Sequence, residues 1–256
     1  MPSSNIPELI AHRGYAACYP ENTLPAFAAA IEAGACYLEC DVQISADLVP
    51  VLFHDLTLER QCCQLGRIRD CSLARLHDFS AGCPERFGNR FAEVRIAALA
   101  ELVELLRPHP GVILFVELKK NSLEEFGPEK VLDIVLEQLS EVRQRAVLIS
   151  YEMNVLQAAR RRGWPAVGAV VDFWDEIRRP ELADLAPDYI FCFVKGLPTS
   201  GPLGFPGAKL AVFEVDVPEE ALALAGRGVE LIETFALVEM QKGLAPLNHD
   251  ISKNLK

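Results

Sequence analysis

The chain has 256 residues, half of them apolar, and a formal net charge of −11 at neutral pH. This length can bury one large core and suits a closed α/β barrel, so we expect a single domain spanning residues 1–256. Nucleic-acid backbones are bound by clustered Lys and Arg, so the acidic balance argues against a nucleic-acid partner.

Hydropathy and the amino-terminal residues indicate a cytoplasmic protein. Mean hydropathy is +0.16, yet no stretch reaches the roughly 18 to 20 uninterrupted apolar residues that a bilayer crossing requires. The opening MPSSNIPELI lacks the basic segment and the following apolar segment of a secretory signal. The eight cysteines show no CxxC spacing, which fits a reducing compartment. We therefore expect a cytoplasmic location and no stable membrane insertion.

Short apolar runs rich in β-branched residues recur along the chain, with amphipathic segments between them. This alternation is typical of βα units around a parallel sheet, and eight units favour a closed barrel over an open sheet. The expected strands lie at 8–13, 36–44, 112–118, 146–150, 166–171, 188–194, 208–215 and 229–234. The sequence therefore predicts a TIM (β/α)8 barrel.

The amphipathic segments predict the surrounding helices. Asn22 or Thr23 is expected to cap the first helix, and Gly34 to end it. After the strand at 188–194, the segment KGLPTSGPLGFPG is too rich in Pro and Gly for a helix and predicts a loop. The expected helices lie at 22–33, 97–107, 128–142, 154–162, 218–226 and 235–242.

Residues 45–96 interrupt the βα rhythm. The segment is too long for an ordinary connection and predicts a small insertion after the second strand. Within it, VPVLFHD at 49–55 indicates a further strand that brings His54 back toward the second strand. The remainder, 56–94, is expected to form a small cap beside the barrel mouth, where loops on a rigid scaffold often carry recognition.

Charged residues stand at the carboxyl ends of three predicted strands, which is where barrel active sites lie. Because strand side chains alternate, Glu39 and Asp41 share one face, and so do Glu117 and Lys119 on the neighbouring strand. Three converging carboxylates repel one another unless a hard cation such as Mg²⁺ or Ca²⁺ lies between them. The alternative is a salt-bridged network with Arg13 and Lys119.

Two histidines occupy similar settings. His12 and His54 each follow an apolar run and stand next to a charged residue. Two histidines beside one phosphorus can act as general base and general acid, because a near-neutral pKa lets one accept and the other donate a proton. Arg13 offers a planar fork for phosphate oxygens, and Gly14 permits a tight turn with close approach of a substrate. Either histidine could instead be a core residue whose ring is satisfied by backbone groups.

Five motifs, in this order and spacing, resemble the glycerophosphodiester phosphodiesterase family. They define a region of about residues 8–120, nearly half of the chain. The motifs are HRG at 12–14, PENT at 20–23, ECD at 39–41, HD at 54–55 and ELK at 117–119.

This resemblance implies a TIM barrel with a small insertion and a small-molecule substrate. The implied reaction is cation-dependent hydrolysis of glycerophosphodiesters to glycerol 3-phosphate and an alcohol. Its implied nucleophile is water or a neighbouring hydroxyl of the substrate. The implied roles are acid and base for His12 and His54, metal ligands for Glu39, Asp41 and Glu117, and substrate contacts for Arg13, Lys119 and Glu21.

The last two strands depart from the family's pattern. LAVFEVDV stands where the family has a tryptophan-containing strand ending in Asn, and VELIETF stands where it has a DGIITD-like strand. Candidates for altered specificity are therefore Phe213, Glu214, Asp216 and Thr234. Three further residues fall at predicted strand ends, with rim polarity or packing as the alternative explanation: Ser150, Trp174 and Lys195.

Two other functions stay open on the sequence. One is a phospholipase of the phosphoinositide or sphingomyelinase D type, whose barrels also pair two histidines with a carboxylate-held cation. The other is a non-catalytic barrel that binds a phosphorylated metabolite. The complete acid, base and metal set favours the enzyme, and the sequence leaves the released alcohol and the oligomeric state open.

Overall fold

The computed structural model describes residues 6–254, with side chains described up to residue 245. The first five residues of the amino-terminal segment considered above lie outside the described range. The barrel strands are β1 (Glu8–His12), β2 (Tyr37–Ile44), β4 (Ile113–Leu118), β5 (Ala146–Ser150), β6 (Val167–Val171), β7 (Tyr189–Phe193), β8 (Lys209–Phe213) and β9 (Leu231–Thr234).

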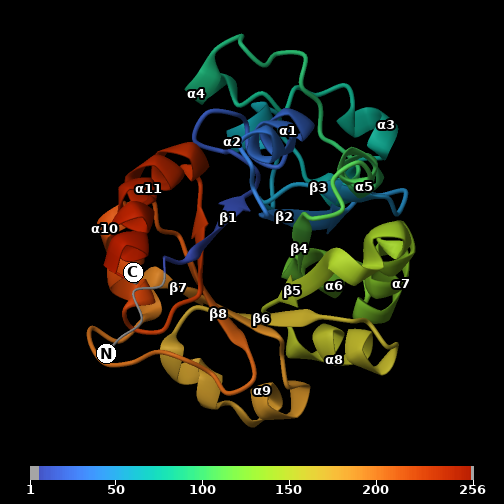
Figure 1. The fold of residues 1–256 in the computed structure, drawn as a ribbon. Coiled ribbons are helices and arrows are strands. Elements are labelled where there is room, and N and C mark those ends of the chain that lie inside the picture. The colour runs from blue at the N-terminus through green and yellow to red at the C-terminus, as the bar shows by residue number, and fades with distance from the viewer. Residues whose placement is uncertain (1–5, 255–256) are drawn as a thin grey trace.

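These strands form a closed parallel barrel with helices around it (Figure 1). The order around the barrel is β1, β2, β4, β5, β6, β7, β8 and β9, and each strand pairs with the next. Strand β1 closes the ring by pairing with β9 as well as with β2. Within the described part of the chain, eight parallel strands make this ring. The predicted TIM barrel is confirmed, and the eight predicted strand positions agree with the observed ones to within a few residues.

The barrel helices are α1 (Leu24–Glu32), α5 (Leu99–Leu106), α6 (Lys120–Phe126), α7 (Pro128–Gln138), α8 (Met153–Arg161), α9 (Pro180–Leu185), α10 (Pro218–Ala225) and α11 (Leu237–Asn254). The six predicted helices are all present, although α7 ends at Gln138 and continues as a 3₁₀ turn, Ser140–Arg145. The segments α6 and α9 were not predicted, because they are too short to show a helical period. As predicted, the Pro- and Gly-rich segment after β7 is a loop, which begins with a 3₁₀ turn, Val194–Gly196. None of the described helices is long and apolar enough to cross a membrane.

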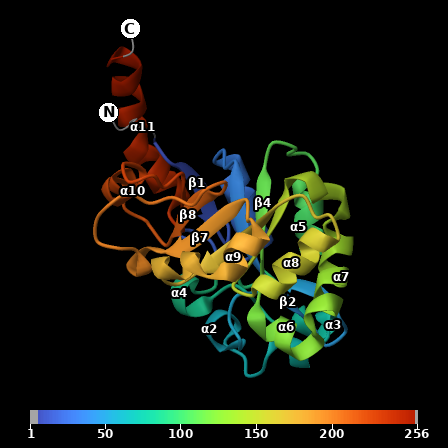
Figure 2. The same ribbon diagram turned by 90° about the horizontal axis from the view of Figure 1, so that it is seen from below.

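Residues 45–96 form a compact segment at one end of the barrel. Its strand β3 (Pro50–Leu52) pairs antiparallel with β2, which returns the chain toward the barrel as predicted for 49–55. The short helices that follow are α2 (Glu59–Cys62), α3 (Leu73–Leu76) and α4 (Pro84–Phe87), with a 3₁₀ turn at Ile68–Asp70 between α2 and α3. Another 3₁₀ turn, Trp174–Arg178, follows β6 in the barrel. Figure 2 shows α2, α3 and α4 grouped at one end of the molecule. They cover a separate apolar cluster that includes Phe53, Leu58 and Leu76. The assignment of 56–94 as an insertion stays a prediction.

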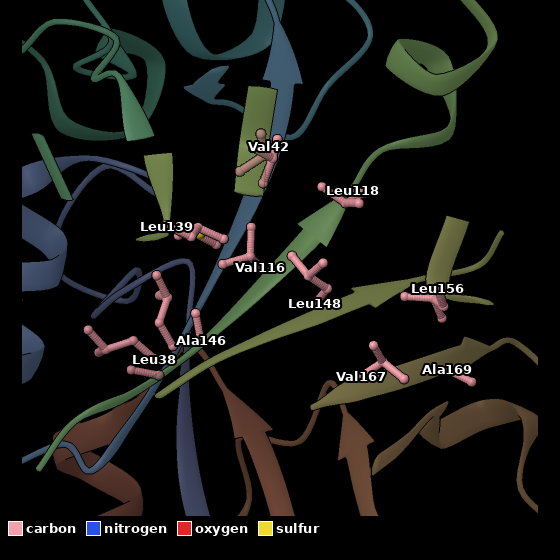
Figure 3. Packing of buried hydrophobic residues seen from close by; sticks show 14 of the residues in the cluster. Leu38, Val42, Val116, Leu118, Leu139, Ala146, Leu148, Leu156, Val167 and Ala169 are labelled. Atoms are coloured by element: carbon pink, nitrogen blue, oxygen red, sulfur yellow. The ribbon is translucent and has the colours of Figure 1, made fainter. Parts of the chain in front are cut away.

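Apolar side chains fill both faces of the barrel wall. Outward-facing residues such as Leu38, Val116 and Leu148 pack beneath the helices (Figure 3). Inward-facing residues fill the barrel itself, where the ring of Phe115 lies 5.0 Å from that of Phe191, centroid to centroid. Burying each large apolar side chain stabilises the fold by roughly 1.5 to 3 kcal/mol. The polar site described below therefore rests on a packed apolar floor.

Candidate active site

A cavity of about 370 Å³ opens at the carboxyl ends of the strands. This volume lies in the range of small-molecule sites. Of the eight site residues predicted from the sequence, six line the cavity: His12, Arg13, Glu39, His54, Glu117 and Lys119. The other two, Glu21 and Asp41, form ion pairs with Arg13. The structure thus brings all eight residues together.

Strand register places the three predicted carboxylates side by side. Asp41 on β2 is the direct neighbour of Glu117 on β4, and Glu39 is the neighbour of His12 on β1. Glu39, Asp41 and Glu117 each offer a carboxylate oxygen, and these oxygens lie within 4.8 Å of one another. Glu39 and Asp41 are buried, with exposed fractions of 1% and 0%. The alternation of strand side chains predicted this convergence.

Two cationic side chains neutralise part of this cluster. Lys119 Nζ lies 3.2 Å from Asp41 Oδ1 and 3.0 Å from Glu117 Oε1, and Arg13 Nε lies 3.0 Å from Asp41 Oδ2. The ion-pair network considered as an alternative is therefore present, but it is incomplete. Glu39 Oε1 is buried and has no hydrogen-bond partner among the described residues. The donor set, all carboxylate oxygens with one left unpaired, fits a hard divalent cation.

The carboxyl groups of this cluster differ in their pKa values. Burial, together with Asp41 and Glu233, raises the pKa of Glu39 well above its usual range. Burial also raises the pKa of Glu117, although Lys119 opposes it. At Asp41 burial acts in the same direction, but Lys119 and Arg13 outweigh it and hold the pKa well below its usual range. A cation between the three groups would favour the ionised form of each.

His12 is held firmly at the edge of this cluster. Its ring stacks on Phe235 with centroids 4.4 Å apart, and Nε2 lies 3.7 Å from Glu39 Oε2. Burial, followed by the charge of Arg13, lowers the pKa of His12 well below its usual range. Nδ1 is buried without a hydrogen-bond partner among the described residues. The ring is therefore not the satisfied core histidine that the sequence allowed, and a neutral imidazole here suits a general base.

His54 approaches the cavity from the loop after β3. Its Nδ1 lies 2.9 Å from Asp55 Oδ1, an arrangement in which Nδ1–H donates and Nε2 is free for a substrate. The loop is fixed by Gln43, whose Nε2 donates to the backbone oxygens of Phe53 and Asp55 over 3.0 and 2.6 Å. Gln43 was not among the predicted site residues, although its position two residues after Asp41 places it on the same face of β2.

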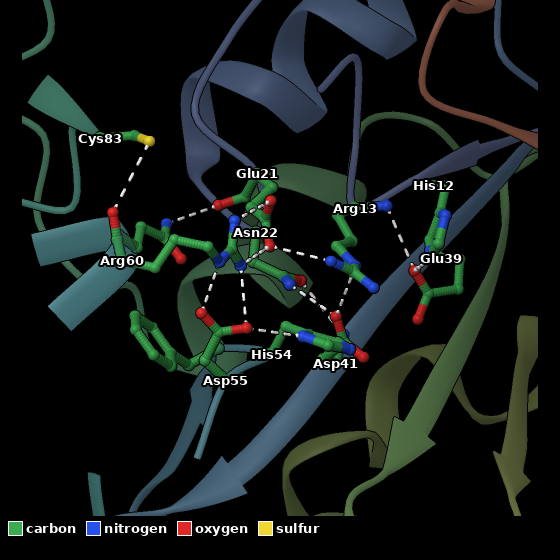
Figure 4. Close-up of polar contacts among 12 residues, drawn as sticks. His12, Arg13, Glu21, Asn22, Glu39, Asp41, His54, Asp55, Arg60 and Cys83 are labelled. Carbon is green, nitrogen blue, oxygen red and sulfur yellow. Dashed lines mark hydrogen bonds and ion pairs between the residues drawn. The ribbon is translucent and has the colours of Figure 1, made fainter. Parts of the chain in front are cut away.

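Glu21 links the first βα loop to the segment after β3, as Figure 4 shows. Its Oε1 accepts from Arg13 Nη1 over 2.9 Å and from Arg60 Nη2 over 2.7 Å. Arg60 also pairs with Asp55, 2.5 Å from Nε to Oδ2, and lines the cavity. Arg60 was missed because it lies among short helices that carry no periodic signal. The predicted substrate contact Glu21 thus orients two arginines.

The expected capping role of Asn22 and Thr23 is wrong for their side chains. Asn22 Nδ2 donates to Asp41 Oδ2 over 2.7 Å, and Asn22 Oδ1 accepts from the Asp41 backbone N–H over 3.1 Å. Thr23 stands at the N-cap position of α1, but its hydroxyl donates to the Pro20 carbonyl over 2.6 Å. Asn22 therefore positions Asp41. The Asn22 amide bonds to Asp41, 19 positions away in the sequence, and not to the start of α1. A capping rule based on neighbouring residues cannot predict such a contact.

Gly14 serves a tight turn, as predicted, with φ of +82°. A Cβ at this position would lie 2.7 Å from the Ala26 backbone carbon. The close approach that requires glycine in this structure is therefore to helix α1, and close approach of a substrate stays a prediction.

The four candidates for altered specificity divide into two pairs. Phe213 and Glu214 line the cavity. Asp216 Oδ1 accepts from Thr234 Oγ1 over 2.6 Å and from the Phe235 backbone N–H over 2.9 Å, so Asp216 and Thr234 fix the turn after β9. The first pair faces the cavity, and the second pair supports the backbone.

The three other residues at strand ends lie outside the cavity lining. Ser150 is buried and its hydroxyl donates to the Leu118 carbonyl over 2.9 Å. Trp174 packs against the outer apolar cluster. Lys195 Nζ lies 5.8 Å from the centroid of the Phe193 ring at the rim.

Glu233 is a cavity residue that the sequence analysis missed. It is 3% exposed, and one of its carboxylate oxygens lies within 4.8 Å of ligand atoms of both His12 and Glu39. Burial and the charge of Glu117 raise the pKa of Glu233 well above its usual range. Its register partner on β1 is Ile10, which faces the barrel interior. Strand alternation along β9 could have identified it.

Comparison with known proteins agrees with this geometry. The profile of the glycerophosphoryl diester phosphodiesterase family matches residues 12–182. A glycerophosphodiester phosphodiesterase of Caldanaerobacter subterraneus subsp. tengcongensis is 29% identical over 88% of this chain and 93% of that protein. Glycerophosphodiester phosphodiesterase 1 of Mus musculus is 37% identical, over 60% of this chain and 49% of that protein.

Solved structures share the fold. A phosphodiesterase of Oleispira antarctica, solved in complex with the product sn-glycerol-3-phosphate, superposes with a TM-score of 0.79 at 25% identity, covering 94% of this chain and 97% of that chain. The crystal structure of a glycerophosphoryl diester phosphodiesterase homologue from Silicibacter pomeroyi has a TM-score of 0.81 at 21% identity and 94% coverage of both chains, and it supports the fold alone. With the matching profile spanning more than half of its length, the chain belongs to the glycerophosphoryl diester phosphodiesterase family.

Proposed function

We propose that this chain hydrolyses glycerophosphodiesters to glycerol 3-phosphate and an alcohol, with His12 and His54 as the proton-transfer pair and a divalent cation held by Glu39, Asp41 and Glu117. The observation that carries the proposal is one cavity that holds both histidines and a buried carboxylate cluster with an unpaired oxygen on Glu39. The product-bound relative from Oleispira antarctica supports the substrate class.

The side chains suggest how the bond to the alcohol is broken. Arg13 and Lys119 lie where they can orient phosphate oxygens, because both line the cavity beside the carboxylates. A divalent cation in the carboxylate cluster would supply further neutralisation of the phosphate charge.

The two histidines suit complementary roles. Neutral His12 accepts the proton of the attacking hydroxyl, as its lowered pKa favours. Doubly protonated His54, with Nδ1–H bonded to Asp55, donates its Nε2 proton to the alcohol oxygen as the phosphorus–oxygen bond to the leaving group breaks. Attack by water gives glycerol 3-phosphate directly, whereas attack by the neighbouring glycerol hydroxyl gives a cyclic phosphate that a water then opens to glycerol 3-phosphate.

The first test is release of glycerol 3-phosphate from glycerophosphocholine with and without EDTA. We expect EDTA to abolish release, and we expect Mg²⁺ or Ca²⁺, added back separately, to restore it. Undiminished release after exhaustive chelation would contradict the metal assignment. Intact phospholipid vesicles are the control substrate, and activity on vesicles alone would contradict the proposed substrate class.

A further inference from the structure

Charge is distributed unevenly around the cavity. Its cationic side chains, Arg13, Arg60 and Lys119, lie on the side built by β1, β2, β4 and the segment after β3, and each is paired with a carboxylate. The opposite side carries Asp172 after β6 and Glu214 after β8. Neither of these two has a Lys or Arg ion-pair partner among the described residues. The first side suits an anionic phosphate, and the second repels one.

Glu233 lies in the depth of the cavity, beside His12 and Glu39. It lines the cavity, is 97% buried and carries an oxygen, Oε1, that no described residue contacts by a hydrogen bond. A buried acceptor without a partner is costly. Its position therefore indicates that a donor or cation from a ligand reaches the depth of the cavity.

Aromatic rings line the side that carries Asp172 and Glu214. Phe193 and Phe213 lie with centroids 5.7 Å apart and planes inclined by 29°, and both face the cavity. Tyr151 also lines the cavity, and its hydroxyl donates to Asp172 Oδ1 over 3.0 Å. Aromatic faces combined with carboxylates are the usual binding site for organic ammonium groups. The rim already attracts a cation, since Lys195 Nζ lies 5.8 Å from the Phe193 centroid.

We propose that this side, formed by Phe193, Phe213, Tyr151, Asp172 and Glu214, binds the leaving alcohol and selects alcohols that carry an ammonium group. The inference rests on the proposed function, because it assigns one end of the cavity to the alcohol of a glycerophosphodiester. Choline and ethanolamine share this chemistry. Neutral alcohols such as glycerol or inositol can donate hydrogen bonds to these carboxylates but bring no positive charge to compensate them.

The test compares kcat/KM for glycerophosphocholine, glycerophosphoethanolamine and glycerophosphoglycerol, under the same metal and buffer conditions. We expect both ammonium substrates to exceed the neutral one by about tenfold at low ionic strength, because several carboxylates and rings contribute together. The preference should shrink in 0.5 M NaCl, because exposed charges are screened by salt.

Charge-neutral variants identify the residues responsible. Asp172→Asn keeps an oxygen acceptor for Tyr151, and Glu214→Gln keeps the side-chain volume. Each should lower the ratio of ammonium to neutral kcat/KM by about threefold to fivefold, and the double variant should lower it further. Asp175→Asn is the matched control, because it removes the same charge from an exposed residue that does not line the cavity.

Two further variants separate the contributions of ring and charge. Phe193→Leu should reduce glycerophosphocholine turnover more than glycerophosphoethanolamine turnover, since a quaternary ammonium depends more on ring faces than on hydrogen bonds. Lys195→Met should raise the ammonium-to-neutral ratio, because it removes a competing cation from the Phe193 ring.

The outcomes distinguish this inference from the function on which it rests. Equal kcat/KM for charged and neutral substrates in the unmodified chain, or ratios in Asp172→Asn and Glu214→Gln equal to that of Asp175→Asn, would overturn the ammonium site while leaving the phosphodiesterase intact. Absence of hydrolysis for all three substrates would refute the proposed function and this inference together.

Discussion

The two sides of the cavity differ in the burial and the pairing of their ionisable groups. On the side of β1, β2 and β4 the ionisable groups are buried or half-buried, and nearly all of them are paired. On the side of β6 to β8 the carboxylates are exposed and unpaired, and they stand beside aromatic rings. Burying a charge without compensation is costly, so each buried residue constrains its neighbours. The exposed carboxylates are free of that constraint, so they can be substituted without loss of the fold.

The largest expected effect tests the chemistry of the buried side. His12→Ala and His54→Ala should each lower kcat by about 10² to 10⁴-fold, the range typical of general acid–base residues. Mn²⁺ binding, followed by calorimetry, should persist in both variants, because neither histidine belongs to the proposed ligand set. His77→Ala, at an exposed position, is the control. Near-normal turnover in both active-site variants would refute the assignment.

An intermediate effect is expected for Asn22, whose side chain holds Asp41 in place on the buried side. Asn22→Gly removes both hydrogen bonds to Asp41 and tolerates the backbone φ of +55° at this residue. Hydrogen bonds to charged groups contribute about 1.5 to 3 kcal/mol, so the free energy of unfolding should fall by about 2 kcal/mol. We expect kcat to fall by about tenfold, because Asp41 loses its orientation.

Thermal unfolding and steady-state kinetics measure the two effects of Asn22→Gly separately. Thr23→Ser, which retains the hydroxyl that donates to Pro20, serves as the control. If Asn22→Gly lowered stability while kcat stayed unchanged, its role would be structural and not that of a positioning residue.

The smallest effect is expected at Asp216, which the sequence placed among the specificity candidates. Asp216→Ala removes the acceptor for Thr234 Oγ1 and for two backbone N–H groups after β9. Loss of such a cap costs about 1 kcal/mol. The melting temperature should fall, while the ratio of ammonium to neutral kcat/KM stays unchanged. A changed ratio would place Asp216 with Asp172 and Glu214 in alcohol recognition.

The half of the site around the carboxylate cluster was predictable because its signals are local in the sequence. The IAHRG, LECDV and LFVELKK runs place ionisable residues at strand ends, and strand alternation then determines which of them share a face. The barrel followed from the repeated βα pattern. By contrast, Arg60 lies in a segment of four-residue helices, and its partners Glu21 and Asp55 are assembled from separate loops. No period or motif marks such a residue.

By itself, the sequence determined the barrel, the polar ends of its first strands and the family to which its motifs point, because each depends on short-range periodicity or spacing. Only the tertiary structure decided that Asn22 holds Asp41 instead of capping a helix, that Glu233 faces the same cavity as His12, and that Asp216 supports a turn. Each of these outcomes depends on which distant polar group lies within hydrogen-bond distance, and closure of the barrel sets that distance.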